Sequence, residues 1–194
     1  NKGIIMANTD APSGFTPLRH LTGGVIRANE YEIANSQADT FSYGDIVTMN
    51  SSGQLDGFAN GVNAVGIFYG VEYIDDATGS VEFVKRWKGA TTVKAGTTPK
   101  AYVYDDPNIT FSVQAGNGAF TQANVGELCN VLLTASTTPY FHSRHEADMA
   151  TLATTAKVLR ILRVENIPGN ETAADAKIEV VINNHLFGTQ NAGI

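Results

Sequence analysis

The histidines are the first residues in this sequence that could do chemistry. His142 and His145 are three residues apart, and Glu146 follows them directly. On a helix, two imidazoles at this spacing share one face and can hold a metal ion such as Zn²⁺. A third ligand would have to come from elsewhere, with His20 and His185 available. A solvated or interfacial histidine pair explains the same spacing without a metal, and it is the preferred interpretation.

Two acidic pairs, Asp75-Asp76 and Asp105-Asp106, are the next candidates. Paired carboxylates can hydrolyse glycosides when the pKa of one is raised, and they can bind Ca²⁺ through oxygen ligands. Adjacent residues on a strand point in opposite directions, so neither pair forms a ready dyad. Aspartate is also a preferred turn residue. The sequence therefore predicts turns at both pairs.

Cys129 is the single cysteine, so no disulfide can form within the chain. It lies in the apolar run Leu128–Leu133, where a buried thiol behaves as a small hydrophobic side chain. No activating base lies near it in the sequence, and the chain has neither a P-loop, a dinucleotide fingerprint nor a Gly-x-Ser-x-Gly elbow. We therefore expect no enzymatic activity, no cofactor and no metal site.

The overall charge argues against nucleic acid as a partner. The formal net charge is −6, from 13 Lys and Arg against 19 Asp and Glu, and the basic residues are scattered. Binding to phosphates depends on clustered basic residues. No apolar stretch approaches the ~20 residues of a membrane span, and residues 1–7 are too short for a signal-peptide core. Met6-Ala7 would be a natural chain start, which predicts synthesis and retention in a cytoplasm-like compartment.

The elements that must position these residues are predicted to be strands. Apolar residues alternate from Val65 to Tyr73, which places Tyr69 and Val71 on one face. The turn Asp76–Gly79 and a second alternating run to Trp87 complete a predicted β-hairpin. A similar pair follows, with strands at 101–104 and 109–114 on either side of Asp105–Pro107.

Further strands are predicted toward the C-terminus. Leu128–Leu133 suits a strand buried on both faces, and 157–164 and 177–183 read as strands. Residues 143–156 fit a helix with a capping box, or equally a long irregular excursion. Many short strands without an internal repeat indicate an all-β fold, namely a single sandwich or small barrel of antiparallel strands.

An extended N-terminal arm is predicted for residues 1–24, ahead of a β domain at 25–194. Prolines and glycines interrupt any long regular element there. The arm nevertheless carries large apolar side chains, which can anchor on its own domain or on a neighbour. A loosely ordered terminus is the other interpretation. The candidate binding residues of the arm are Phe15, Pro17, Leu18, Arg19 and His20.

Three segments together resemble a known family. They are Met6 to Pro17, the stretch Tyr102 to Asn108 with Phe111, Val113 and Gln114, and the closing Lys157-Val158-Leu159 with Lys177 to His185. The chain resembles the capsid decoration (cement) proteins of tailed bacteriophages, small structural proteins found with the major capsid protein. The similarity spans most of the chain in order, and 25–60 and 115–156 are its least distinctive regions.

The resemblance implies a virion protein made in the host cytoplasm and placed on the outer surface of the capsid. It would bridge neighbouring major capsid protein subunits, with the arm lying along the shell and copies associating, for example as a trimer. The main alternative is a carbohydrate- or receptor-binding β module of the phage tail. That alternative needs a flat platform of exposed aromatic rings, for which Tyr102, Tyr104 and Trp87 are the candidates.

Overall fold

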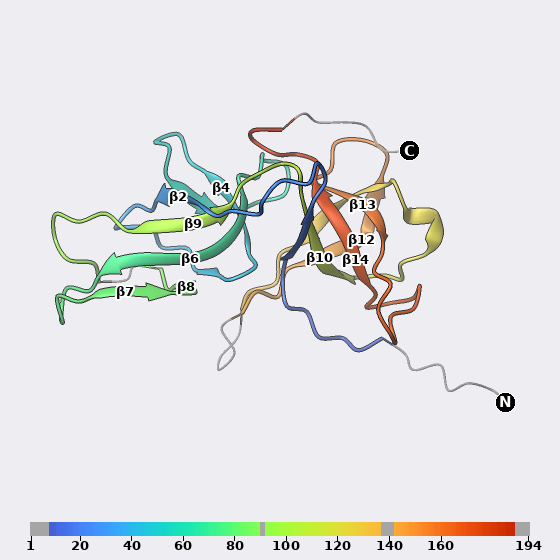
Figure 1. Cartoon of the computed structure of the whole chain (residues 1–194), viewed down its shortest axis with the longest axis horizontal. Helices are drawn as coiled ribbons and strands as arrows, with labels where there is room; N and C mark the ends of the chain where they lie inside the picture. Colours follow the sequence, from blue (N-terminus) through green and yellow to red (C-terminus); the bar gives the residue numbers. More distant parts are fainter. Residues whose placement is uncertain (1–7, 90–91, 137–141, 189–194) are drawn as a thin grey trace.

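The chain folds into two β lobes that lie side by side, a closed barrel and a more open sheet (Figure 1). The computed structural model describes residues 8–89, 92–136 and 142–188. The predicted chain start at Met6-Ala7 lies outside these residues. The described residues contain many strands, one short 3₁₀ helix and no α-helix, so the predicted all-β fold is confirmed.

The barrel closes because strand β10 pairs with strands on both of its sides. Five strands run in the order β10-β12-β11-β13-β14 and return to β10, while β1 adds to β10 beside β12. The contact of β10 with β12 is parallel and short, and the other pairings are antiparallel. The barrel strands are β1 (Thr16–His20), β10 (Ile109–Gly116), β11 (Leu128–Leu132), β12 (Glu146–Ala153), β13 (Leu159–Val164) and β14 (Lys177–Ile182), with the 3₁₀ helix η1 (Gln122–Asn124) between β10 and β11.

The second lobe is a sheet, and a separate two-stranded sheet formed by distant segments covers one of its faces. Its strands run in the order β2-β9-β6-β4-β5, and β7 pairs with the far half of β6. The pair β3 and β8 carries Phe41 and Trp87 into the core of this lobe. The strands are β2 (Asn29–Glu32), β3 (Phe41–Ser42), β4 (Ile46–Met49), β5 (Leu55–Gly57), β6 (Gly66–Ile74), β7 (Val81–Val84), β8 (Arg86–Trp87) and β9 (Lys100–Tyr104).

Strands β4 and β6 join the two lobes by supplying side chains to both cores. Successive side chains of a strand point to opposite faces. Ile46 and Ile67 are paired across β4 and β6 and lie in the barrel core. The next residues along, Val47 and Phe68, lie in the core of the sheet lobe. The two lobes are therefore packed on opposite faces of the same two strands.

Two predictions about secondary structure and strand pairing were wrong. Residues 143–156 form no helix, because Glu146–Ala153 is strand β12, which pairs along β11 and touches β10. The β-branched Thr151 and the ladder of β11 favour the extended backbone there. The strands 101–104 and 109–114 exist as β9 and β10 but do not pair with each other. The residues between them carry the chain from one lobe to the other.

A β-bulge in β6 changes which residues share a face. Its register against β9 shifts between Phe68 and Gly70, so two residues of β6 face one of β9. Phe68 and Val71 both point into the sheet core, whereas Tyr69 points away from it. The predicted common face of Tyr69 and Val71 was therefore wrong. The predicted hairpin itself, β6 with β7, is confirmed.

Candidate binding surfaces

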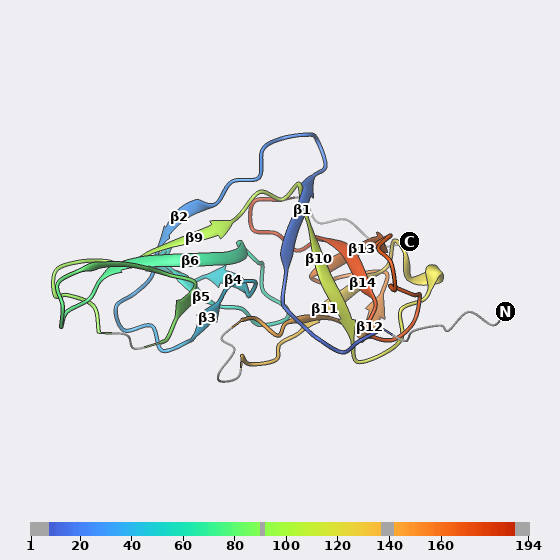
Figure 2. The ribbon, with the colours of Figure 1, turned by 60° about the horizontal axis from the view of Figure 1, so that its bottom comes forward.

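The described part of the N-terminal arm, from residue 8 onward, lies along the barrel, with β1 beside β10 (Figure 2). Phe15 is completely buried in the barrel core and meets Phe111 edge-on at 6.3 Å between ring centroids. Gly14 has a positive φ of 70°, and a Cβ there would lie 2.2 Å from the Cβ of Ser143. The backbone can pass this closely only because residue 14 is a glycine. Phe15 is thus part of this protein's own core.

The other candidate residues of the arm divide between buried and exposed. Pro17 and His20 are half-buried, whereas Leu18 and Arg19 are exposed, Leu18 to 42%. Leu21, just past β1, is 47% exposed, and Ile167 lines the same groove as Leu18. These exposed side chains, Leu18, Arg19, Leu21 and Ile167, are called the arm ridge below. Its role in binding a partner stays a prediction.

A buried carboxylate fastens the arm to the barrel. Glu179 of β14 is 1% exposed and accepts hydrogen bonds from Arg19 Nε at 2.7 Å and from Arg163 Nε at 2.5 Å. Burial alone would raise the pKa of Glu179, but the hydrogen bonds from Arg19, Thr110 and Arg163 outweigh it and lower that pKa. The two ion pairs therefore link the arm strand β1 to β13 and β14, which lie far from it in the sequence.

His20 makes a second link between the arm and the chain that connects the lobes. Its Nε2 lies 2.9 Å from Asp106 Oδ2, while its Nδ1 accepts from the backbone N–H of Gly24 at 3.1 Å. The backbone N–H of Asn108 also donates to Asp106, and together with His20 it lowers the pKa of that carboxyl group. This histidine therefore has a structural role in the loop after β1.

An aromatic cluster lies on the face of the sheet lobe that is opposite its core. Neighbouring rings have centroids 5.4–6.0 Å apart, mostly edge-to-face, an arrangement that stabilises aromatic pairs. Gly70 makes room for it, because a Cβ there would lie 2.8 Å from Cζ of Phe83. Phe83 is 48% exposed, and the tyrosines are half-buried. The cluster consists of Tyr43, Tyr69, Phe83, Tyr102 and Tyr104.

Lys85 lies across this cluster. Its Nζ is 4.4 Å from the ring centroid of Tyr43 and 4.3 Å from that of Tyr69, within cation–π range. No carboxylate lies within 4 Å of this ammonium group among residues 8–89, 92–136 and 142–188. The five rings and Lys85 are called the aromatic–lysine face below.

Two phenols of this face, those of Tyr43 and Tyr104, ionise less readily than free tyrosine. Burial, followed by the neighbouring Tyr43 and Tyr69, raises the pKa of Tyr104 to about 12. Burial and Tyr69 also raise the pKa of Tyr43. Since a phenolate would be destabilised at these two positions, their hydroxyl groups stay protonated and are available as hydrogen-bond donors. The face therefore combines aromatic rings and hydroxyl groups with one cation, Lys85.

The sequence indicated only part of this face. Tyr102 and Tyr104 were candidates and belong to it, whereas Trp87 is fully buried and cannot contribute. Tyr43, Phe83 and Lys85 were missed. Phe83 of β7 and Lys85, the first residue after that strand, are two residues apart, which is a usable signal, but the contact of Tyr43 comes from tertiary packing alone.

The polar candidates lie apart from one another. His142 is exposed, Asp75 and Thr78 form the turn of the β6–β7 hairpin, and Asp105 accepts from Asn29 and Tyr31. The described residues contain no group of three or more His, Cys, Asp or Glu side chains placed to hold a metal ion. The geometry that the histidine spacing would need for a metal, a helix, is not formed.

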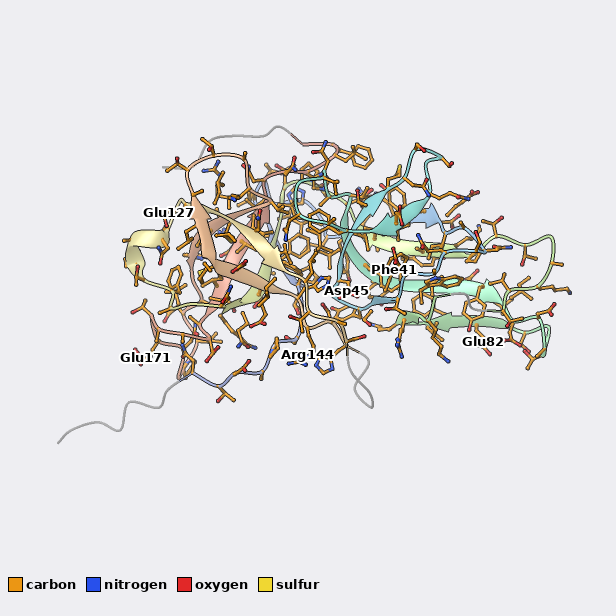
Figure 3. All side chains as sticks on the ribbon, turned by 180° about the vertical axis from the view of Figure 1, so that it is seen from behind. Phe41, Asp45, Glu82, Glu127, Arg144 and Glu171 are labelled. Atoms are coloured by element: carbon orange, nitrogen blue, oxygen red, sulfur yellow. The ribbon has the colours of Figure 1, made fainter. Side chains whose placement is uncertain are left out.

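His145 lies in a cleft between the lobes. The cleft encloses about 310 Å³ and is also lined by Asp39, Asp45 and residues 133–136, and Figure 3 shows Asp45 where the lobes meet. His145 Nδ1 accepts from the backbone N–H of Ile46 at 3.3 Å, and burial lowers the pKa of this histidine. Within the described part of the chain, no serine hydroxyl contacts its ring, and the Ser143 hydroxyl instead accepts from the backbone N–H of His145.

Cys129 is confirmed as a core residue. It is fully buried in the barrel, and burial, with smaller contributions from Asp148 and Glu127, raises the pKa of its thiol to about 12. A reactive cysteine needs an accessible thiolate. The thiol therefore acts in packing.

Comparison with known proteins gives no identification: no family model, no curated protein and no solved structure matches this chain. Across the described residues, no helix has both the length and the apolar character required to cross a membrane.

Proposed function

We propose that this protein is a non-enzymatic decoration protein of a tailed-bacteriophage head. It binds the outer surface of the shell and bridges neighbouring subunits of the major capsid protein. The proposal rests on the family resemblance of three sequence segments and on one structural observation. Exposed side chains suited to protein contacts occur on both lobes, at two separate places.

A bridging protein needs two contact surfaces that cannot move independently. The arm ridge lies on the barrel and the aromatic–lysine face lies on the sheet lobe. Ile46 and Ile67, on strands β4 and β6 of the sheet lobe, are buried in the barrel core. A force applied at one surface is therefore transmitted to the other. Modest contacts of this kind add up when many copies occupy a fixed lattice.

Self-association completes the proposal. Copies meet around a local three-fold axis as a trimer, which places identical surfaces against neighbouring capsid subunits. The acidic balance of the chain, −6, suits the exterior of a head, away from packaged DNA. The protein is made in the host cytoplasm and carried on the outer surface of the virion.

The test is binding to heads that lack the protein. Purified chain should bind expanded empty heads at a fixed number of copies and raise their resistance to heat and to low salt. Deleting the whole arm would be a poor probe, because it removes Phe15 from the barrel core. The paired variants Leu18→Ser and Leu21→Ser change exposed residues and should lower occupancy while the fold is retained. Imaging of the virion that finds the protein on the tail and none on the head would refute the proposal.

A second candidate function is supported by the aromatic–lysine face. A tail module that binds carbohydrate would stack sugar rings on exposed aromatic side chains. Phe83 is the exposed ring of this face, and the half-buried Tyr102 packs edge-on against it. This alternative would be favoured if the protein bound sugars on a glycan array, if Tyr102→Ser abolished that binding, and if the protein did not bind heads.

A further inference from the structure

The aromatic–lysine face lies on the side of the sheet that packs against the barrel, just beyond the part that the barrel covers. At its inner end, Ile67 lies in the barrel core and Tyr104 packs against it. One step outward along the same face lie Tyr69 and Tyr102, and Phe83 lies at the outer end on β7. The barrel therefore covers the inner part of this sheet face, whereas Phe83 at its outer end is left 48% exposed.

The rings of this face are arranged for contact with a protein rather than for stacking sugars. A sugar needs an open ring face, but Lys85 covers faces of Tyr43 and Tyr69. The edge-to-face contacts turn other rings onto one another. Tyrosines fixed in this way present edges and hydroxyl groups, as tyrosines do at the centres of protein interfaces.

The charge of the face identifies what it fits. Lys100 on the same sheet is paired with Glu30 at 2.9 Å, so its charge is already balanced. The ammonium group of Lys85 is fixed over two rings and has no carboxylate within 4 Å in the described residues. A partner carboxylate reaching Lys85 would complete this site, and apolar groups beside that carboxylate would cover Phe83 and Tyr102.

We propose that the aromatic–lysine face is a docking surface for a protein segment that presents a carboxylate flanked by apolar side chains, with Lys85 and Phe83 as its main anchors. This inference rests on the proposed function, in which the segment belongs to the capsid subunit. Under this proposal, the sheet lobe makes the specific contact with the capsid subunit, and the arm ridge makes a second contact.

The experiment measures binding of purified chain to empty heads that lack it. Lys85→Met keeps an apolar stem but removes the charge, and it should weaken binding about tenfold, as expected for an interface anchor. Lys85→Glu should weaken binding further, because like charges then face each other. Phe83→Ser should weaken binding by at least about tenfold. Lys94→Met and Val62→Ser, exposed residues outside the face, are the matched controls and should bind like the unchanged protein.

The outcomes separate the two proposals. Failure of the unchanged protein to bind heads refutes the decoration function itself. Normal binding by the unchanged protein and by the Lys85 and Phe83 variants overturns the docking surface and leaves the decoration function standing. Capture of an acidic polysaccharide in place of heads also overturns the docking surface. A thermal melt of each variant should match that of the unchanged protein, so that loss of binding is not loss of fold.

Discussion

The two lobes differ in what their sheets leave uncovered. In the barrel, five strands close on themselves, and the arm strand β1 is fastened over β10 by the Glu179 ion pairs. In the sheet lobe, β7 lies at an open edge, β2 and β5 meet only through a single bridge between Ile33 and Leu55, and one face carries aromatic rings outside the core. Closure removes sheet edges, whereas open edges and exposed rings are available to partners.

This difference indicates that the two lobes have different roles, the barrel in stability and the outer face of the sheet lobe in binding. The barrel core takes in Phe15 from the arm, Cys129 from β11 and residues of every barrel strand except β1. The sheet lobe divides its aromatic residues, with Trp87 and Phe68 inside and Phe83 and Tyr102 outside. Substitutions in the barrel should therefore act on stability, and substitutions on the outer sheet face should act on binding.

The largest expected effect is a contrast between two phenylalanines. Phe15→Ala removes a fully buried ring and should lower the free energy of unfolding by about 3–5 kcal/mol. Phe83→Ala changes a ring that is 48% exposed and should cost less than about 1 kcal/mol. Urea denaturation of both variants measures the difference. Equal losses would mean that the outer rings contribute to folding as much as the barrel core does.

Two glycines test the junction of the lobes against the outer face. A Cβ at Gly66 would lie 2.1 Å from the backbone oxygen of Tyr104. Gly66→Ala must therefore shift the backbone at the point where the chain passes from the sheet lobe to the barrel. We expect a loss of about 3 kcal/mol, at the upper end for overpacking. At Gly70 the nearest atom is the tip of the Phe83 side chain, which can rotate away. Gly70→Ala should therefore cost less, and thermal melts that rank the two in reverse order would contradict this account of the junction.

The Glu179 ion pairs should give the barrel an acid-sensitive contribution to stability. Glu179→Gln leaves two arginines without a charge partner, and we expect a loss of about 1–2 kcal/mol at neutral pH, because both guanidinium groups are half exposed. The folded state lowers the pKa of Glu179, so its stabilisation is present above the ordinary pKa of 4.5 and is lost as pH falls through the lowered value. Denaturation curves of the protein and the variant should converge on acidification.

Glu32→Gln, an exposed position on an edge strand of the sheet lobe, is the control for that substitution. This substitution should leave the free energy of unfolding nearly unchanged at both neutral and acid pH. A difference between Glu179→Gln and the unchanged protein that persisted at acid pH would show that packing, rather than charge, is what the variant loses.

The sequence predicts most strands here but few of their neighbours. Alternation is local, so the hairpin of β6 and β7 follows from residues 65–87. Pairing across the barrel depends on contacts between distant segments, such as β10 with β14. The strands at 101–104 and 109–114 were predicted from the same local signal, but the four residues between them cross from one lobe to the other instead of forming a hairpin.

The candidate surfaces show the same limit. Glu179 alternates with apolar residues and therefore resembles a solvent-facing position, yet it is buried because β1 and two arginines cover it. Val71 lies on the opposite face from Ile67 and Tyr69 because of the bulge between Phe68 and Gly70, and a strict period of two does not predict such a bulge. What the sequence does predict is the pair Tyr102 and Tyr104, since two residues separated by one on a strand share a face.

The smallest expected effect concerns the phenols of the outer face. The folded state raises the pKa of Tyr104 to about 12, so the neutral phenol contributes stability below the ordinary pKa of 10, and this contribution is lost as pH rises through the raised value. An absorbance titration of the folded protein should show that Tyr104→Phe removes a late phenolate step and leaves the early steps in place. Loss of an early step instead would mean that Tyr104 is well solvated, and the inner end of the aromatic–lysine face would then not be sealed against the barrel.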